Sequence, residues 1–159
     1  MEIWELIVRE SVRDVIARYN FYGDSGRMDD LIALFSEDAV MDMGGDALTG
    51  RDAIRQGFLD AGSSFVGFAK RAGLPRDLPV LRHYTATHVL DATSETSATC
   101  SSYYATFMAK GPDHWGSYTD QFALRDGCWQ ITSRVVTVDG ATVGGMGAET
   151  LAKQGRGGF

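Results

Sequence analysis

The chain of 159 residues carries 15 Lys and Arg against 21 Asp and Glu, a net charge of −6, and 44% of its residues are hydrophobic. This length suits one domain, since domains cluster at about 100–150 residues, and it excludes an enzyme with separate cofactor and substrate domains. The acidic balance, with no run of Lys or Arg, argues against nucleic-acid binding, which needs a clustered basic surface.

The remaining composition predicts a cytoplasmic protein. No apolar stretch approaches the roughly 18–20 residues that span a bilayer, and residues 1–5 lack the pattern of a signal peptide. We therefore expect no membrane partner. Cys100 and Cys128 are predicted to be buried thiols, because a core of this size needs no disulfide.

The first part of the chain predicts helices. From residue 3 to 22, apolar side chains recur at three- and four-residue steps, which indicates an amphipathic helix. A glycine-containing turn at residues 23–26 ends it, and a short second helix is expected through residue 35. Residues 39–43 alternate like a short strand. Thr49 and Asp52 have the spacing of a capping box for a third helix through residue 59.

The second part predicts strands. Residues 62–79 contain glycines and two prolines without a clear period, so we expect a long connection of the kind that often forms a lid. Residues 81–90, 97–108, 115–124 and 128–138 read as four strands with short turns, hence as an antiparallel meander. The glycine-rich end is expected to be mobile, or ordered only by a ligand or a second subunit.

Together these elements predict an α+β fold. Three N-terminal helices pack into the concave side of a curved, mixed or antiparallel sheet, giving a cone-shaped α+β barrel over residues 1–140 and a tail over residues 141–159. A cavity between helices and sheet is a common site for a small molecule.

The motif inventory favours acid–base chemistry without a cofactor. The sequence has no glycine-rich nucleotide loop, no nucleophilic serine elbow and no His-Glu-x-x-His motif. No metal site is predicted, since His83 and His88 are five positions apart and should point to opposite faces of a strand. His88 is interpreted as structural and His114 as solvated in a turn.

The candidate catalytic residues are Tyr19, Asp24 and His83. Asp24 follows the first helix and His83 opens the first long strand. A carboxylate that accepts a hydrogen bond from one imidazole nitrogen fixes the tautomer, so this pair would act as a general base while Tyr19 polarises a substrate oxygen. The alternative is that Asp24 caps the next helix and that Tyr19 is a core residue.

The candidate substrate-binding residues are Tyr104, Tyr118 and Asp120. Tyr118 and Asp120 share one face of a strand, and an acid beside aromatic residues is unusual on a solvent face. Asp120 is equally well explained by a pair with Arg134 on the next strand.

The order of motifs resembles the SnoaL-like branch of the nuclear transport factor 2-like superfamily, over about residues 5 to 139. The resemblance is carried by Ile16-Ala-Arg-Tyr19, by residues 24–31, 34–39 and 49–54, by Arg82-His83, by residues 87–89, by Tyr118-Thr-Asp120, and by residues 126–129 leading to Arg134. Within that superfamily, the positions of Tyr19, Asp24 and His83 resemble the dehydratases related to scytalone dehydratase and to bile acid 7α-dehydratase.

This resemblance implies a cofactor-free elimination of water next to an acidified C–H. The sequence departs from those dehydratases at Thr106 and Met108, where they place a further His or Asp. The same fold resembles ketosteroid isomerase, limonene epoxide hydrolase and polyketide cyclases, so the fold alone does not select the reaction.

We therefore expect a dehydratase or isomerase of an apolar cyclic small molecule. The alternatives are a non-catalytic binding module, or a polyketide cyclase or epoxide hydrolase in the same pocket. The resemblance further implies a homodimer or homotrimer.

Overall fold

The computed structural model describes residues 1–74 and 81–153. Its helices are α1 (Ile3–Asp24), α2 (Met28–Ala33), α3 (Arg51–Arg71) and α4 (Met146–Lys153). Its strands are β1 (Phe35–Asp42), β2 (Leu48–Thr49), β3 (Arg82–Ser94), β4 (Ser97–Met108), β5 (Gly111–Arg125) and β6 (Cys128–Ala141). No helix in these described ranges is both long enough and apolar enough to cross a membrane.

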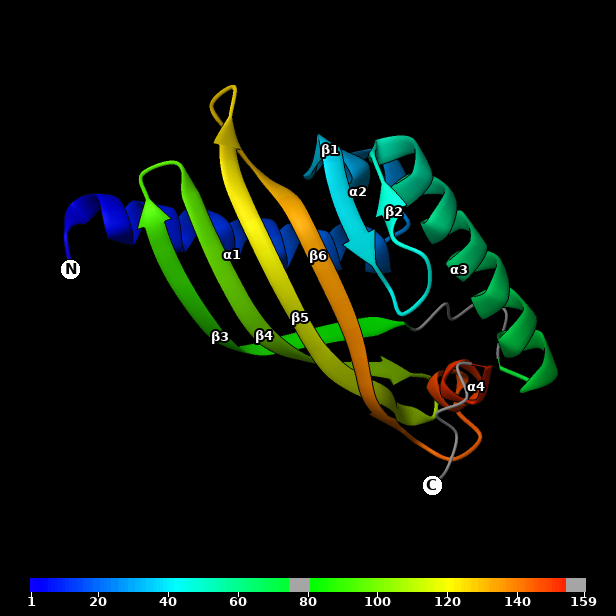
Figure 1. Cartoon of the computed structure of the whole chain (residues 1–159). Coiled ribbons are helices and arrows are strands. Elements are labelled where there is room, and N and C mark those ends of the chain that lie inside the picture. The colour runs from blue at the N-terminus through cyan, green and yellow to red at the C-terminus, as the bar shows by residue number, and fades with distance from the viewer. Residues whose placement is uncertain (75–80, 154–159) are drawn as a thin grey trace.

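The strands form one mixed sheet in the order β2-β1-β6-β5-β4-β3. β1 runs parallel to β6, and every other neighbouring pair is antiparallel. The sheet is strongly curved and open, with α1 across one face and α3 beyond the β1–β2 edge (Figure 1). The predicted α+β fold and the β3–β6 meander are confirmed, although the sheet does not close into a barrel.

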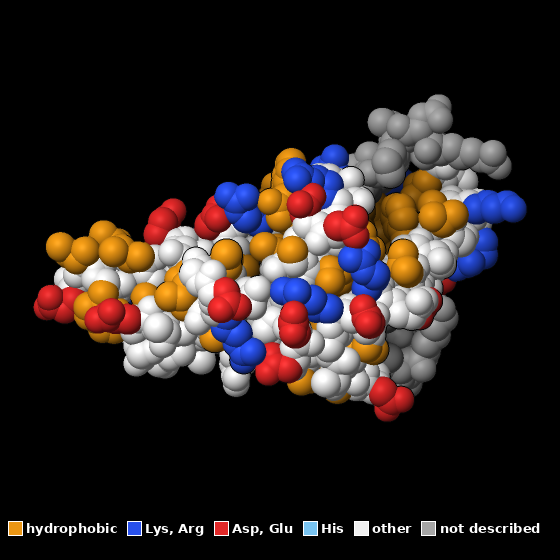
Figure 2. Space-filling view, turned by 90° about the horizontal axis from the view of Figure 1, so that it is seen from above, with side chains coloured by type: hydrophobic (Ala, Val, Ile, Leu, Met, Phe, Trp, Pro, Cys, Tyr) orange, Lys and Arg blue, Asp and Glu red, His pale blue; other side chains and the backbone are white. Residues whose placement is uncertain are grey.

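The core lies between α1 and the concave face of the sheet. α1 buries residues at three- and four-residue steps, as its sequence predicted: Val8, Val12, Val15, Ile16 and Tyr19. At its start, the Glu5 carboxylate accepts the backbone N–H of Glu2 at 2.7 Å. Its N-terminal end extends beyond the strands and exposes a group of apolar side chains (Figure 2): Met1, Ile3, Leu6 and Ile7.

The connection expected at residues 62–79 is helical in its first part. α3 continues to Arg71, because Phe68 is buried and because Lys70 and Arg71 favour the negative end of the helix. Gly62 and Gly67 weaken a helix without breaking it. Residues 75–79 of the predicted connection lie outside the described residues.

Other predicted features also differ from the structure. Thr49 belongs to β2, and α3 begins after Gly50 with no capping side chain, so the predicted capping box is absent. The second helix ends at Ala33, and β1 begins earlier than expected, at Phe35. Cys100 is buried as predicted, but Cys128 is exposed at the start of β6. Within the tail, residues 146–153 form α4 rather than a mobile end.

Candidate active site

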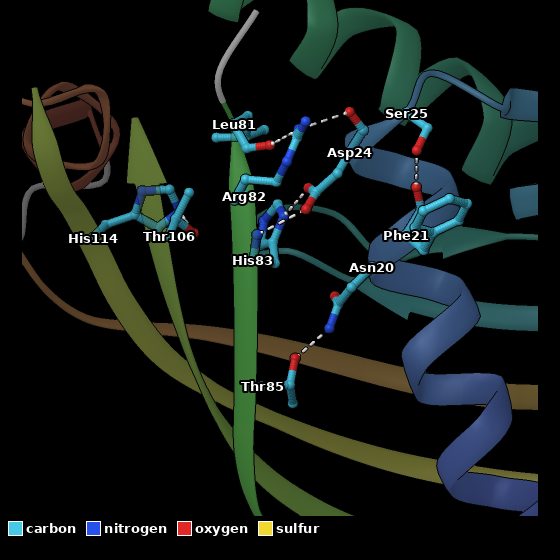
Figure 3. Close-up of polar contacts among 10 residues, drawn as sticks. All are labelled: Asn20, Phe21, Asp24, Ser25, Leu81, Arg82, His83, Thr85, Thr106 and His114. Carbon is cyan, nitrogen blue, oxygen red and sulfur yellow. Dashed lines mark hydrogen bonds and ion pairs between the residues drawn. The ribbon is translucent and has the colours of Figure 1, made fainter. Parts of the chain in front are cut away.

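Asp24 and His83 form a hydrogen-bonded pair between α1 and β3. Oδ1 of Asp24 lies 2.7 Å from Nδ1 of His83, and Oδ2 accepts the backbone N–H of His83 at 2.9 Å (Figure 3). The Asp24 side chain is 8% exposed and that of His83 is 23% exposed. Because a carboxylate only accepts hydrogen bonds, Nδ1 carries the ring proton and Nε2 has the lone pair of a base.

Asp24 does not cap a helix. α2 begins after Arg27, and no side chain caps it. Asp24 is the last residue of α1, at the negative end of the helix dipole, where a carboxylate is unfavourable for helix stability alone. The capping interpretation of Asp24 is therefore wrong, since its carboxylate binds His83.

A groove of about 350 Å³ lies between α1 and β3. Along α1 its lining extends from Arg13 to Asp24, so the Asp24–His83 pair lies at the end nearest the helix C-terminus. Asn20 donates a hydrogen bond across the groove to the Thr85 hydroxyl (Figure 3). The candidate base is therefore reachable from a groove that the packing of helix on strand creates.

His88 lines the same groove as His83 because β3 contains a bulge. The register with β4 shifts between Ala86 and Val89, so two residues of β3 oppose one residue of β4. Thr87 lies in this bulge with a φ of +57°. The prediction that His83 and His88 point to opposite faces is wrong, since both line the groove.

His88 differs from His83 in having no carboxylate partner among the described residues. Its Nε2 is buried without a hydrogen bond, as is Oδ1 of Asn20. Burial lowers the pKa of His88, and the charge of Arg13 lowers it further, so the ring is neutral at pH 7. Among residues 1–74 and 81–153, no three His, Cys, Asp or Glu side chains gather closely enough to hold a metal ion.

The three candidate tyrosines form a row of rings that begins at His83. The Tyr104 ring centre lies 6.3 Å from that of His83, and Tyr118 stacks on Tyr104 at 4.5 Å. Tyr19 contacts Tyr118 edge-on at 6.1 Å. Tyr104 is therefore the tyrosine next to His83, whereas Tyr19 lies at the other end of the row.

Burial keeps these tyrosines protonated. It raises the pKa of Tyr19, Tyr104 and Tyr118 above the usual value of 10.0. Their hydroxyls therefore remain hydrogen-bond donors at neutral pH. Such donors suit an oxygen on which negative charge develops.

Asp120 binds Arg134 with both of its carboxylate oxygens. Nε and Nη2 of Arg134 donate to the two oxygens of Asp120, each at 2.7 Å, and neither side chain is exposed. The guanidinium lies 3.8 Å from the Tyr19 ring centre and 4.5 Å from that of Tyr118. The cross-strand pair predicted as the alternative for Asp120 is thus present. Its guanidinium also packs on the rings of Tyr19 and Tyr118.

A second Asp–His pair was missed by the sequence analysis. β5 begins at Gly111, so His114 belongs to a strand and is not in a solvated turn. Its Nδ1 lies 2.8 Å from Oδ2 of Asp113. Its Nε2 lies 3.2 Å from Oγ1 of Thr106, and Figure 3 shows these two side chains side by side. An Asp next to a His was the available signal, but neighbours on a regular strand point to opposite faces.

The sequence of residues 4–135 matches the family of the SnoaL-like domain. No curated protein sequence matches the chain. A candidate scytalone dehydratase from Novosphingobium aromaticivorans is similar in structure, with a TM-score of 0.70 and 22% identity, covering 86% of this chain and 87% of that one.

Two further solved structures share the fold. LinA has a TM-score of 0.64 and 16% identity, covering 86% of this chain and 89% of its own. An NTF2-like protein with a cystatin-like fold, also from Novosphingobium aromaticivorans, has a TM-score of 0.64 and 23% identity, covering 87% of each chain. These TM-scores show a common NTF2-like architecture, and at such low identities they do not select the reaction.

Proposed function

The chain belongs to the SnoaL-like domain family, and on that premise we propose that it is a cofactor-independent dehydratase or isomerase of an apolar cyclic small molecule. The observation that carries this proposal is the 2.7 Å hydrogen bond between Asp24 and His83 beside a groove. An imidazole held by a carboxylate has the geometry of a general base. The similar candidate scytalone dehydratase supports the same class of reaction.

In the proposed reaction, Nε2 of His83 removes a proton from a carbon next to a carbonyl group. Asp24 holds the ring and stabilises the imidazolium that forms. In dehydration, the resulting enolate then expels the hydroxyl of the neighbouring carbon, which takes up a proton and leaves as water. In isomerisation, the enolate takes the proton of His83 at another carbon. Each step needs only proton transfer and stabilisation of an oxyanion.

We assign the oxyanion donor to Tyr104. Its ring is adjacent to His83, and burial raises its pKa, so its hydroxyl keeps the proton to donate. Tyr19, the donor expected from the sequence, packs on the buried Arg134 at the far end of the row. Tyr118 would then support the ring of Tyr104 by stacking.

The experiment is turnover of steroid, terpenoid and polyketide panels, followed by mass spectrometry, with His83→Asn as the test variant. The Asn amide keeps a donor for Asp24 but removes Nε2, so we expect the rate to fall by about 10²–10⁴ with the fold retained. His88→Asn is the matched control, because His88 lines the same groove without a carboxylate partner. Its rate should stay within a few-fold of wild type.

The outcomes separate the alternatives. Loss of the mass of water supports dehydration, an unchanged mass supports isomerisation or cyclisation, and a gain of water supports hydrolysis. Binding without any product favours a binding module. A larger loss for Tyr19→Phe than for Tyr104→Phe returns the donor role to Tyr19. Full activity of His83→Asn contradicts the proposed base.

We also propose a cytoplasmic homodimer or homotrimer. Tyr84, Val89 and Tyr103 project from the convex side of β3 and β4 and are 64%, 61% and 61% exposed. Large exposed apolar side chains on one face are typical of an interface. Light scattering that gives the mass of one 17.3 kDa chain contradicts the assembly.

A further inference from the structure

His83, Thr106 and His114 lie in a row across three strands. His83 pairs with Thr106 in the ladder between β3 and β4, and Thr106 pairs with His114 in the ladder between β4 and β5. Residues directly opposite each other on antiparallel strands share a face. The two imidazoles therefore stand on the same concave face, one on either side of the buried Thr106.

Each end of this row carries a buried carboxylate. Asp24 binds Nδ1 of His83 at 2.7 Å, and Asp113 binds Nδ1 of His114 at 2.8 Å. The side chains of the aspartates are 8% and 5% exposed, and those of the histidines 23% and 17%. Both imidazoles thus have Nδ1 directed to a carboxylate, which leaves Nε2 for acid–base chemistry.

Asp113 is fixed as an anion. Burial alone would raise its pKa, but hydrogen bonds from His114 and from the backbone N–H groups of Gly147 and Met146 outweigh burial and lower it. An ionised Asp113 accepts the Nδ1 proton of His114. Nε2 of His114 then accepts from the Thr106 hydroxyl at 3.2 Å when the ring is neutral, and donates when it is protonated.

Tyr104 lies between the two imidazoles. Its ring centre is 6.3 Å from that of His83 and 5.9 Å from that of His114. The outer strands of the row are two strand spacings apart, about 9.6 Å at the backbone. The two imidazoles therefore flank the Tyr104 ring, whose phenol is a hydrogen-bond donor.

We propose that Asp113 and His114 form a second acid–base dyad of the same site, which gives a proton to the leaving hydroxyl. This inference rests on the proposed function. The C–H of the substrate faces His83 and its hydroxyl faces His114. His83 takes the proton as the C–H bond breaks, the C=C bond forms as the C–O bond breaks, and protonated His114 gives its proton to the departing hydroxyl, which leaves as water. Transfer of the proton from His83 to His114 through solvent restores both groups.

A purely structural role for His114 accounts for less of the geometry. Holding α4 requires the carboxylate of Asp113 and its bonds to Met146 and Gly147, none of which uses Nε2 of His114. The orientation of Nε2 along the row toward Thr106 has no part in that contact. The two roles therefore predict different results when Nε2 alone is removed.

The test uses 3-hydroxycyclohexanone in D₂O as the probe and His114→Asn as the variant. The Asn amide keeps a donor for Asp113 and removes Nε2. We expect wild type to accelerate both exchange of the C2 hydrogens and formation of cyclohexenone. His114→Asn should keep exchange within a few-fold and lose elimination by about 10²–10⁴, whereas His83→Asn should lose both. Elimination at the wild-type rate, or equal loss of exchange, overturns the role of His114.

A binding measurement separates this inference from the proposed function. The enolate of cyclohexane-1,3-dione has oxygens where the probe has its carbonyl and its hydroxyl. In a ¹⁵N NMR titration, we expect it to shift the imidazole signals of His83 and His114 more than that of His88. Shifts at His83 alone overturn the second dyad and leave the proposed function standing. Shifts at neither, together with no exchange by wild type, count against both.

Discussion

Asp24 reaches His83 from the end of a helix 59 positions earlier, whereas Asp113 binds the residue that follows it in the same strand. The bonds are almost the same length, but the first depends on the packing of α1 on β3 and the second on local backbone geometry. The ladder between β4 and β5 shifts at this point, and Asp113 is the additional residue. A dyad can therefore be built by tertiary packing or by one bulge.

The two aspartates also differ in what else they hold. The second oxygen of Asp24 returns to the backbone of His83, so both oxygens serve the same residue. Asp113 additionally accepts the N–H groups of Met146 and Gly147 at 2.8 and 2.9 Å and so fixes the start of α4. The first carboxylate orients an imidazole, while the second does so and also anchors a helix.

Replacing Asp113 should destabilise the protein more than any other change at the two dyads. Asp113→Ala leaves His114 and two backbone N–H groups without their acceptor, and we expect a loss of about 1–3 kcal/mol in the free energy of unfolding. Native-state hydrogen exchange should show α4 opening well before the sheet. Denaturant unfolding and exchange of the α4 amides measure both effects.

Asp24→Ala is the matched variant. It removes two hydrogen bonds, where Asp113→Ala removes three, and should leave the protection of α4 unchanged, because the side-chain hydrogen bonds that the structure gives Asp24 go to His83. If α4 stays protected in Asp113→Ala, or loses protection equally in Asp24→Ala, the anchoring role of Asp113 is wrong.

The bulge in β3 puts His88 on the same face of the strand as His83. Deleting Thr87 leaves these two residues four apart on a regular strand, which again puts them on one face. The deletion also removes a β-branched residue with a φ of +57°, a conformation that costs about 1–2 kcal/mol. We therefore expect the free energy of unfolding to change by no more than about 1 kcal/mol.

A deletion in a regular part of the sheet is the control. Ser101 pairs without interruption with Thr119 on β5, so deleting it turns half of β4 over and exposes buried side chains. That variant should fail to fold, as judged by near-ultraviolet circular dichroism. Equal damage from the two deletions would mean that Thr87 is not an additional residue in its strand.

Much of the fold followed from patterns along the sequence. The apolar periodicity of residues 3–22 predicts α1, and short turns between alternating segments predict the β3–β6 meander. Both patterns are regular along the sequence. The predicted third helix ends at residue 59, because the small residues between 62 and 67 weaken helical periodicity. In the structure α3 continues to Arg71, and Phe68 is buried. Thr49 had the spacing of a cap but is taken into a strand.

The site was predictable only where a resemblance supplied long-range information. Asp24 and His83 are predicted to pair as a general base. The structure joins them by a hydrogen bond, and their catalytic role stays a prediction. Strict alternation along a strand predicts neither the position of His88 nor the pairing of Asp113 with His114, because each depends on one bulged residue. A bulge leaves no reliable mark in a single sequence, since its signal is a register that only the neighbouring strand defines.

His88 has neither a carboxylate partner nor a hydrogen bond at Nε2 among the residues that the structure describes. Its pKa is lowered by burial and by Arg13, against a weaker opposite effect of Asp120. The unfolded chain then binds a proton at a higher pH than the folded protein does. The contribution of His88 to the free energy of unfolding is fully present above the ordinary pKa of 6.5. It is lost as the pH falls from there toward the lower pKa of the folded protein.

His88→Gln should therefore flatten the dependence of the free energy of unfolding on pH below 6.5. One proton changes this slope by at most about 1.4 kcal/mol per pH unit, and partial exposure of the ring makes the real difference smaller. Urea unfolding of wild type and variant between pH 5 and 8 measures it, because the substitution leaves every other titratable side chain in place. Identical slopes would show that His88 gains its proton as easily in the folded protein as in the unfolded chain, and would remove the distinction between a histidine held by a carboxylate and one that is merely buried.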